Sequence, residues 1–299
     1  DINQNITLGM RMLILQKIRD YQQLMKLSLS MLVVMSSLVG YMMVPDLEVR
    51  FLNVLWLFLG GTLVTAAANA SNQLLESKSD KIMKRTMSRP LPDMRMGNME
   101  AFIFIGICLI VGVFVLYYFF NILSAVLALM SFLLYVFAYT PLKKVSSISV
   151  LVGAIPGSLP CLIGWAAATN HIGSIAAWTL FIIQFFWQFP HFWSIAWLAH
   201  EDYTRAGMKM LPHKEKVGHF TAFQCVLYSA VLIPLSVLPM IAGLGGWISF
   251  VGLILAATWL FYNSFSFLKN NSDAMARKVM LASFVYLPFI LLSLLLDKY

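Results

Sequence analysis

Apolar residues gather into nine long runs along the chain, separated by shorter polar stretches. Because about 20 apolar residues let a helix cross a bilayer, each run predicts one transmembrane helix. The runs lie near residues 27–44, 51–71, 100–119, 122–139, 149–168, 175–198, 221–242, 247–267 and 279–296. The pattern predicts an all-α, polytopic membrane protein with nine transmembrane helices.

Composition supports this interpretation, since 60% of the 299 residues are hydrophobic and only 11% are charged. Soluble domains carry about 25% charged residues. The chain is therefore expected to be a multi-pass integral protein of the lipid bilayer, with no separate soluble domain.

Basic residues fall almost entirely on one side of the predicted membrane. Of the 21 Lys and Arg residues, all but Arg50 and Lys298 lie in the N-terminal segment or in connections on its side. Because Lys and Arg concentrate in cytoplasmic loops, the N-terminus is expected in the cytoplasm. The net charge of +8 then follows from topology and requires no nucleic-acid partner.

The same topology divides the chain into functional parts. Residues 1–26 are expected to form a cytoplasmic amphipathic segment at the membrane surface, and residues 27–299 one transmembrane domain. Two long cytoplasmic connections, about 72–98 and 199–220, are expected to cap it. No Arg/Ser-rich presequence is recognisable, which favours a bacterial cytoplasmic membrane over the mitochondrial inner membrane.

The first long connection opens with a polar stripe. Asn72, Glu76 and Asp80 are spaced four residues apart, so on a helix they project from one face. Oxygen donors in such a row suit Mg²⁺, which binds through one or two carboxylates and takes further ligands from substrate phosphates. The stripe predicts a magnesium site at the membrane boundary.

Cations follow directly after these acids, at Lys81, Lys84, Arg85 and Arg89. Cations beside a carboxylate-bound metal create a site for a highly charged anion such as a diphosphate. The alternative is a solvated charged loop, in which the helical spacing of the acids is accidental.

The second long connection repeats this mixture of charges with Glu201, Asp202, Arg205 and Lys209. Lying on the same face, the two blocks are expected to hold one diphosphate between them. Taken alone the second block is a weak signal, because acidic pairs begin many helices.

Polar groups also lie inside predicted spans. Gln188 and His191 stand among Phe and Trp residues, where polar side chains are costly unless they face a cavity or a partner helix. A buried structural histidine and a substrate contact both remain open for His191. The span 149–168 carries Gly153, Gly157 and Gly164 with two prolines, which favours close helix contact beside a cavity.

Several segments together resemble one family. They are Asn72-x₃-Glu76-x₃-Asp80, Arg85-Thr-x₂-Arg89-Pro-Leu, Tyr139-Thr-Pro-Leu-Lys143, Trp187-Gln-x-Pro-His191-Phe and Glu201-Asp-Tyr-x₂-Ala-Gly207. The chain resembles the protohaem IX farnesyltransferase branch of the UbiA superfamily of intramembrane prenyltransferases, from about Tyr21 to the last span.

This resemblance implies nine helices around a central cavity and transfer of a farnesyl group from farnesyl diphosphate to a vinyl group of haem B, with Mg²⁺, giving haem O. Haem A synthase or a terminal oxidase assembly is the implied downstream partner. The implied metal site comprises Asn72, Glu76, Asp80 and Asp202, with Glu201 as a further candidate. The implied diphosphate site comprises Arg85, Arg89, Tyr139 and Lys143, with Lys26, Lys81 and Lys209 in reserve. His191 and Gln188 are the candidates beside haem.

Two departures from the superfamily pattern affect the metal. Glu76 stands where Asp is usual, which is expected to shift the metal rather than abolish binding. Lys209 stands where a later acid of the second motif is usual, which puts a second carboxylate-bound Mg²⁺ in doubt.

Other functions stay open at this point. A related enzyme that prenylates an aromatic quinone precursor shares most of the motifs. A membrane transporter also explains buried polar groups in Pro-broken helices, but predicts charges nearer the bilayer centre. A non-catalytic haem-insertion partner is a further alternative.

Overall fold

The computed structural model describes residues 2–211 and 219–298, with side chains from residue 11 onward, and this part of the chain contains helices and no strands. The all-α prediction is confirmed. The helices are α1 (Ile2–Met25), α2 (Leu27–Met42), α3 (Phe51–Asp80), α4 (Asn98–Phe119), α5 (Ile122–Leu133), the π-helix η1 (Leu134–Tyr139), α6 (Thr140–Leu142), α7 (Ser149–Thr169), α8 (Ile175–Leu198), α9 (His200–Arg205), α10 (Phe220–Leu235), α11 (Leu238–Ile241), α12 (Trp247–Lys269) and α13 (Asp273–Leu296).

Seven helical segments of the described chain are long and apolar enough to cross a membrane, and an eighth is added if the bent pair α1 and α2 is one span. Residues Arg11–Met25 and Leu27–Met42 meet at an angle of 49°. The predicted span 175–198 forms α8, but α8 is not one of these seven helices. Its sequence holds the strongly polar residues Gln184, Gln188 and His191. The count of nine and the orientation of the N-terminus stay predictions.

Helix α3 carries the predicted polar stripe out of the apolar region without a break. It runs for 30 residues, and from Thr62 to Asp80 its sequence contains neither Gly nor Pro. Small residues before Asn72 do not interrupt the helix, since Ala is its best former. Asn72, Glu76 and Asp80 therefore share one rigid element, as their spacing predicted.

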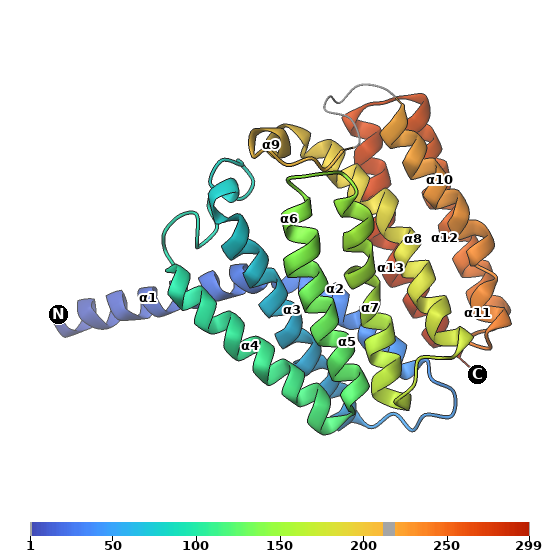
Figure 1. Ribbon diagram of the computed structural model, residues 1–299, viewed down its shortest axis with the longest axis horizontal. Helices are drawn as coiled ribbons and strands as arrows, with labels where there is room; N and C mark the ends of the chain where they lie inside the picture. Colours follow the sequence, from blue (N-terminus) through green and yellow to red (C-terminus); the bar gives the residue numbers. More distant parts are fainter. Residues whose placement is uncertain (1, 212–218, 299) are drawn as a thin grey trace.

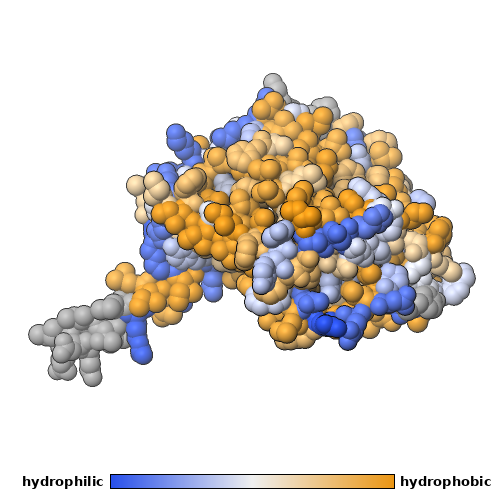
Figure 2. Space-filling model, turned by 60° about the horizontal axis from the view of Figure 1, so that its bottom comes forward, coloured by the Kyte–Doolittle hydropathy of each residue, from blue (hydrophilic) through white to orange (hydrophobic). Residues whose placement is uncertain are grey.

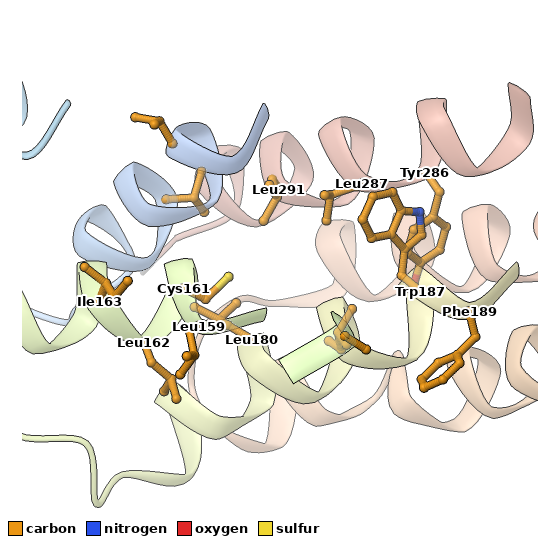
Figure 3. Packing of buried hydrophobic residues seen from close by; sticks show 14 of the residues in the cluster. Leu159, Cys161, Leu162, Ile163, Leu180, Trp187, Phe189, Tyr286, Leu287 and Leu291 are labelled. Carbon is orange, nitrogen blue, oxygen red and sulfur yellow. The ribbon is translucent and has the colours of Figure 1, made fainter. Parts of the chain in front are cut away.

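Helix α7 lies between α2, α5 and α8 and is the most buried of the apolar spans. A Cβ atom at Gly164 would lie 1.8 Å from the Ser37 carbonyl oxygen, and one at Gly40 would lie 2.3 Å from the Cys161 carbonyl oxygen. Glycine is thus required where α2 and α7 cross. Figure 3 shows side chains of α7, α8 and α13 filling the space between these helices.

The two prolines of α7 leave carbonyl groups without a helical donor, and α5 supplies one. Pro160 cannot donate to the carbonyl of Pro156, and Ser131 Oγ donates to that oxygen at 3.1 Å. The prediction that this helix borders a cavity is confirmed, since both prolines line one.

The last residues of the described chain tie three helices together at the end of the bundle opposite α9 (Figure 1). Lys298 Nζ donates to the carbonyls of Met42 and Val44, at 2.5 and 2.8 Å. The Asp297 carboxylate accepts from the amides of Ser249 and Gly246, and these hydrogen bonds lower the pKa of Asp297.

The segments that hold the two predicted polar blocks lie at the same end of the helical bundle. Figure 1 shows α9, α6 and the segment after α3 together at one end, and the α4–α5 and α7–α8 turns at the other. In the view of Figure 2, apolar side chains cover much of the surface. Such a surface fits contact with lipid, and the polar segments gather where a membrane would end.

Candidate active site

The three residues of the polar stripe are all buried at the upper end of α3. The exposed fractions are 2% for Asn72, 5% for Glu76 and 0% for Asp80. Buried carboxylates require cations or hydrogen-bond donors, so their partners define the site.

Glu76 is paired with a cation from another helix. Lys143 is the residue directly after α6, and its Nζ atom lies 2.5 Å from Glu76 Oε1. Both side chains are less than 10% exposed. The same ammonium lies 4.8 Å from the centre of the Tyr139 ring, within the range of a cation–π contact. Tyr139 ends the π-helix η1, a local irregularity that is frequent at functional sites.

Asp80 is paired with the segment that follows α3, residues 81–97, which we call the cap segment. Arg89 Nη1 donates to Asp80 Oδ2 at 2.8 Å, and Thr86 Oγ1 donates to the Asp80 carbonyl at 3.0 Å. Asp80 Oδ1 is buried and has no hydrogen-bond partner in the described chain. One carboxylate oxygen is therefore left for a ligand.

Asn72 receives a cation from the junction between α1 and α2. Lys26 Nζ donates to Asn72 Oδ1 at 3.3 Å, and Asn72 Nδ2 donates to Thr140 Oγ1 at 3.3 Å. Lys26 has a φ angle of 48°, in the left-handed region that non-glycine residues seldom adopt. Such conformations persist where the surrounding structure enforces them, often at functional sites.

Asp202 joins the second polar block to the cap segment. Its carboxylate accepts from the backbone amides of Lys84 and Arg85, at 3.2 and 3.3 Å, and from Arg205 Nη2 at 2.5 Å. The two blocks therefore meet on one side of the bundle. The described contacts of Asp202 are with the cap segment and α9.

The other predicted residues of the blocks are more exposed. The side chains of Glu201, Lys81, Arg85 and Lys209 all lie at the surface. Lys209 still contacts the site through its backbone, since its amide donates to the Lys143 carbonyl at 2.7 Å.

An apolar cavity of about 190 Å³ lies within the bundle next to these charges. It is bordered by side chains from α2, α3, α4, α5, η1, α7, α8 and α13. At one end it reaches Asn69 and Tyr139, one helical turn from Asn72 and Lys143 respectively, and at the other it reaches Gly61 and Leu116. The predicted central cavity is therefore present.

His191 and Gln188 both line this cavity. His191 Nδ1 lies 2.9 Å from Ser283 Oγ, and its ring stacks on Trp187 with centroids 4.9 Å apart. Gln188 Nε2 donates to Ser158 Oγ at 2.7 Å and to the Ala154 carbonyl at 3.0 Å. Both side chains thus have structural partners and also border the cavity.

Two further buried side-chain amides of α3, Asn69 and Gln73, are not among the predicted site residues. Asn69 Nδ2 donates to the Met25 carbonyl at 3.1 Å and to Ser30 Oγ at 3.0 Å. Gln73 Nε2 donates to the carbonyls of Gln23 and Leu24. Polar amides at the end of an apolar helix were the available signal.

The donor set fits a hard divalent cation. Asn72, Glu76 and Asp80 each offer side-chain oxygen atoms as ligands, and Asp80 Oδ1 is both buried and unpartnered in the described residues. The described chain contains no group of three or more His, Cys, Asp or Glu side chains that could hold a metal ion by themselves. Mg²⁺ needs only one or two carboxylates when phosphate and water complete its shell.

These features define the class of molecule that the site suits. Four buried or half-buried side chains of both signs, Glu76, Asp80, Arg89 and Lys143, lie beyond the end of an apolar cavity that Asn69 and Tyr139 line. The arrangement suits a substrate with a highly charged head and an apolar tail.

Comparison with known families agrees with this class. Residues 33–286 match the UbiA prenyltransferase family. The chain belongs to this family and is a prenyltransferase, not a transporter.

Two similar proteins within this family carry the same name. The protoheme IX farnesyltransferase of Cytophaga hutchinsonii is 40% identical over 278 residues, which cover 93% of this chain and 97% of that protein. The protein of the same name from Flavobacterium psychrophilum is 40% identical over 286 residues, 94% of each chain.

Solved structures show the same fold at lower identity. A digeranylgeranylglyceryl phosphate synthase structure aligns with a TM-score of 0.77 and 21% identity over 94% of this chain and 98% of that one. A UbiA homologue from Archaeoglobus fulgidus, bound to GPP and Mg²⁺, aligns with a TM-score of 0.68 and 14% identity over 92% of this chain and 99% of that one.

Proposed function

We propose that this protein transfers the farnesyl group of farnesyl diphosphate to a vinyl group of haem B, giving haem O and diphosphate. The observation that carries the proposal is the pairing of acids and cations next to one end of an apolar cavity. The relatives named protoheme IX farnesyltransferase support this choice of substrates.

The reaction breaks the bond between farnesyl C1 and the diphosphate oxygen and forms a bond between C1 and the terminal vinyl carbon of haem B. The bonding electrons leave with diphosphate, and the vinyl π electrons form the new bond. The resulting cation beside the porphyrin takes up water, which loses a proton to leave the hydroxyl group. Farnesyl diphosphate, haem B and water are thus converted to haem O, diphosphate and a proton.

Arg89 and Lys143 are the residues proposed to bind the departing diphosphate. Each is paired with a carboxylate of α3 and is 20% or less exposed. Charged donors in a site with little water stabilise developing negative charge strongly. Lys26 contacts Asn72 of the stripe, and the Tyr139 ring lies against Lys143. Arg85 and Lys81 add positive charge from the cap segment.

Asn72, Glu76 and Asp80 are proposed to hold Mg²⁺, with Asp202 positioning the cap segment beside them. When bound, Mg²⁺ supplies positive charge that neutralises the diphosphate leaving group. Asp80 offers its unpartnered Oδ1, whereas the Glu76 carboxylate is shared with Lys143. Glu201 is a weaker candidate because it is exposed.

The cavity has the length of a farnesyl chain. Its lining runs from Asn69 to Gly61 on α3 and from Gly153 to Ile163 on α7, which is about 12 and 15 Å at about 1.5 Å per residue. Three extended isoprene units span about 15 Å with carbon–carbon bonds of about 1.5 Å. Apolar walls of this depth exclude water from the allylic cation.

The wall formed by α8 and α13 is the proposed side for haem. Trp187, His191, Phe192 and Phe284 line the cavity there. Aromatic rings favour stacking on a planar porphyrin. Because His191 Nδ1 contacts Ser283, Nε2 is the ring atom left for the substrate or for the water that is added.

The proposed setting is a bacterial cytoplasmic membrane, in agreement with the bacterial relatives. Haem B and farnesyl diphosphate are the proposed partners in the bilayer and at its surface. Haem O would then pass to a haem A synthase or to terminal oxidase assembly.

Incubating membranes that contain the protein with farnesyl diphosphate and either haem B or 4-hydroxybenzoate tests the proposal. The expected result is prenylated haem and released diphosphate with haem B alone. Prenylation of 4-hydroxybenzoate, with haem B unchanged, would overturn it in favour of a quinone-type enzyme.

A further inference from the structure

Arg95 contacts both α1 and the cap segment through one guanidinium group. On the α1 side, Nε donates to Asp20 Oδ1 at 3.0 Å and Nη2 donates to Gln23 Oε1 at 3.2 Å. On the cap side, Nη2 donates to the Ser88 carbonyl at 3.0 Å and Nη1 pairs with the Asp93 carboxylate. Because the guanidinium is a rigid planar fork of five donors, Arg95 fixes these two segments relative to each other.

In the cap segment, Arg95 is connected to Arg89 through Ser88. Ser88 directly precedes Arg89, and the Arg89 amide donates to the Thr86 carbonyl at 3.0 Å. The amide of Arg95 also donates to the Pro90 carbonyl at 2.9 Å. Residues 86–95 therefore form a closed turn that Arg95 fastens, and Arg89 projects from this turn to Asp80.

In α1, Arg95 is connected to Lys26 through Gln23, which lies in the last turn of that helix. The carbonyl of Gln23, whose side chain binds Arg95, accepts from the Gln73 amide of α3 at 3.1 Å, and the Met25 carbonyl accepts from Asn69 at 3.1 Å. Lys26 comes next in the chain and reaches Asn72. The last turn of α1 is thus held both to α3 and, through Arg95, to the cap segment.

The pairing of Arg95 with α1 is built into a buried position. Asp20 is 1% exposed, and a buried carboxylate that loses its partner is costly. Nearby, Lys17 and Tyr21 of α1 both contact Glu100 at the start of α4, at 2.8 and 2.9 Å. These contacts keep α1 against both the cap segment and the start of α4.

We propose that Arg95 is a positioning residue of the diphosphate site, which holds Arg89 and Lys26 on two sides of the stripe from Asn72 to Asp80. The inference rests on the proposed function, because diphosphate is the group that these cations are proposed to bind. Arg95 acts through the cap segment and α1 and does not touch the substrate itself.

The test compares Arg95→Gln and Arg95→Lys with a matched control, Arg50→Gln, which changes an exposed arginine paired with Glu48 at the other end of the bundle. For Arg95→Gln we expect the KM for farnesyl diphosphate to rise about ten- to a hundredfold, since small misplacements of binding groups have effects of this size. The KM for haem B should stay near wild type, whereas the melting temperature should fall, because the buried Asp20 carboxylate loses its charged partner. Arg95→Lys should restore part of the affinity, and Arg50→Gln should behave as wild type.

An unchanged KM for farnesyl diphosphate in Arg95→Gln contradicts the positioning role, and so does an equal rise in KM for both substrates. If Arg95→Gln fails to fold, Gln23→Ala is the second variant, because it removes one acceptor of Arg95 and leaves the buried Arg95–Asp20 ion pair intact. The KM of Gln23→Ala for farnesyl diphosphate should rise. An unchanged KM overturns the proposal. If the wild-type protein does not farnesylate haem, the proposed function fails. Binding of inorganic diphosphate with Mg²⁺ then decides the Arg95 proposal separately, by its loss or retention in Arg95→Gln.

Discussion

Asp80 binds Arg89 through one carboxylate oxygen and keeps the other buried and unpartnered within the described chain. Nη1 of Arg89 lies 2.8 Å from Oδ2, and Oδ1 has no donor. Buried polar atoms are almost always satisfied, so an open oxygen beside a cation fits a residue that completes its contacts when metal and diphosphate bind.

Asp80→Asn keeps the size of the side chain and removes its charge. We expect haem farnesylation to fall at least about a hundredfold, which is typical when one electrostatic contact to a reacting group is removed. The melting temperature should change little, because the amide still accepts from Arg89. Asp46→Asn is the matched control, since Asp46 is exposed in the connection between α2 and α3. A wild-type rate for Asp80→Asn would contradict the proposed metal site.

The adjacent acids Asp202 and Glu201 are expected to differ. Asp202 accepts from two amides of the cap segment, whereas the Glu201 side chain is exposed and makes no hydrogen bond or ion pair in the described chain. Asp202→Ala should therefore lower kcat/KM for farnesyl diphosphate about tenfold or more, and Glu201→Ala should leave it nearly unchanged. Steady-state kinetics of the two variants measure this difference. A larger loss of kcat/KM in Glu201→Ala than in Asp202→Ala would show that Glu201 is the metal ligand of the second block.

The end of the cavity at Gly61 and Leu116 is expected to set the prenyl chain length. Leu116 is fully buried and lines this end, and Gly61 lines it from α3. Leu116→Ala should raise the use of geranylgeranyl diphosphate relative to farnesyl diphosphate. Gly61→Leu should raise the use of geranyl diphosphate, because the added side chain shortens the cavity.

Leu109→Ala is the control for these changes, since Leu109 is on α4 but does not line the cavity. Product chain length is measured by mass spectrometry in competition between the diphosphates. If all three variants and the wild-type protein prefer the same prenyl diphosphate, the prenyl chain binds outside this cavity.

The crossing of α2 and α7 is expected to be sensitive to a single methyl group. Gly164→Ala places a Cβ atom 1.8 Å from the Ser37 carbonyl oxygen, so the helices must separate, at a cost of at least about 2 kcal/mol. Gly106→Ala is the matched control, because a Cβ there meets nothing within 4 Å. Thermal unfolding in detergent should show a clearly lower melting temperature for Gly164→Ala alone.

The sequence was most informative where one helix carries the relevant residues. The spacing of Asn72, Glu76 and Asp80 predicted a common face, and α3 places all three on one continuous helix. The glycines of the span 149–168 likewise predicted close helix contact, because only a residue without Cβ allows it. In both cases local periodicity determines the geometry.

Relationships between distant segments were less accessible. The partner of Glu76 is Lys143, 67 residues away, and the amides that Asp202 binds belong to the cap segment. Nothing in the sequence near Arg95 indicates Asp20 as its partner, so in the sequence Arg95 contributes only to the asymmetry of basic residues. Such pairs depend on how the helices pack, which spacing along one helix does not encode.

The most direct test of the central claim is mass analysis of haem extracted from cells that lack this protein, that contain it, or that contain its Asp80→Asn variant. We predict that haem O appears with the wild-type protein and is lost with the variant, and that the purified wild-type protein makes haem O from haem B and farnesyl diphosphate only when Mg²⁺ is present. Haem B of unchanged mass in cells with the wild-type protein, or equal haem O with Asp80→Asn, would contradict the account.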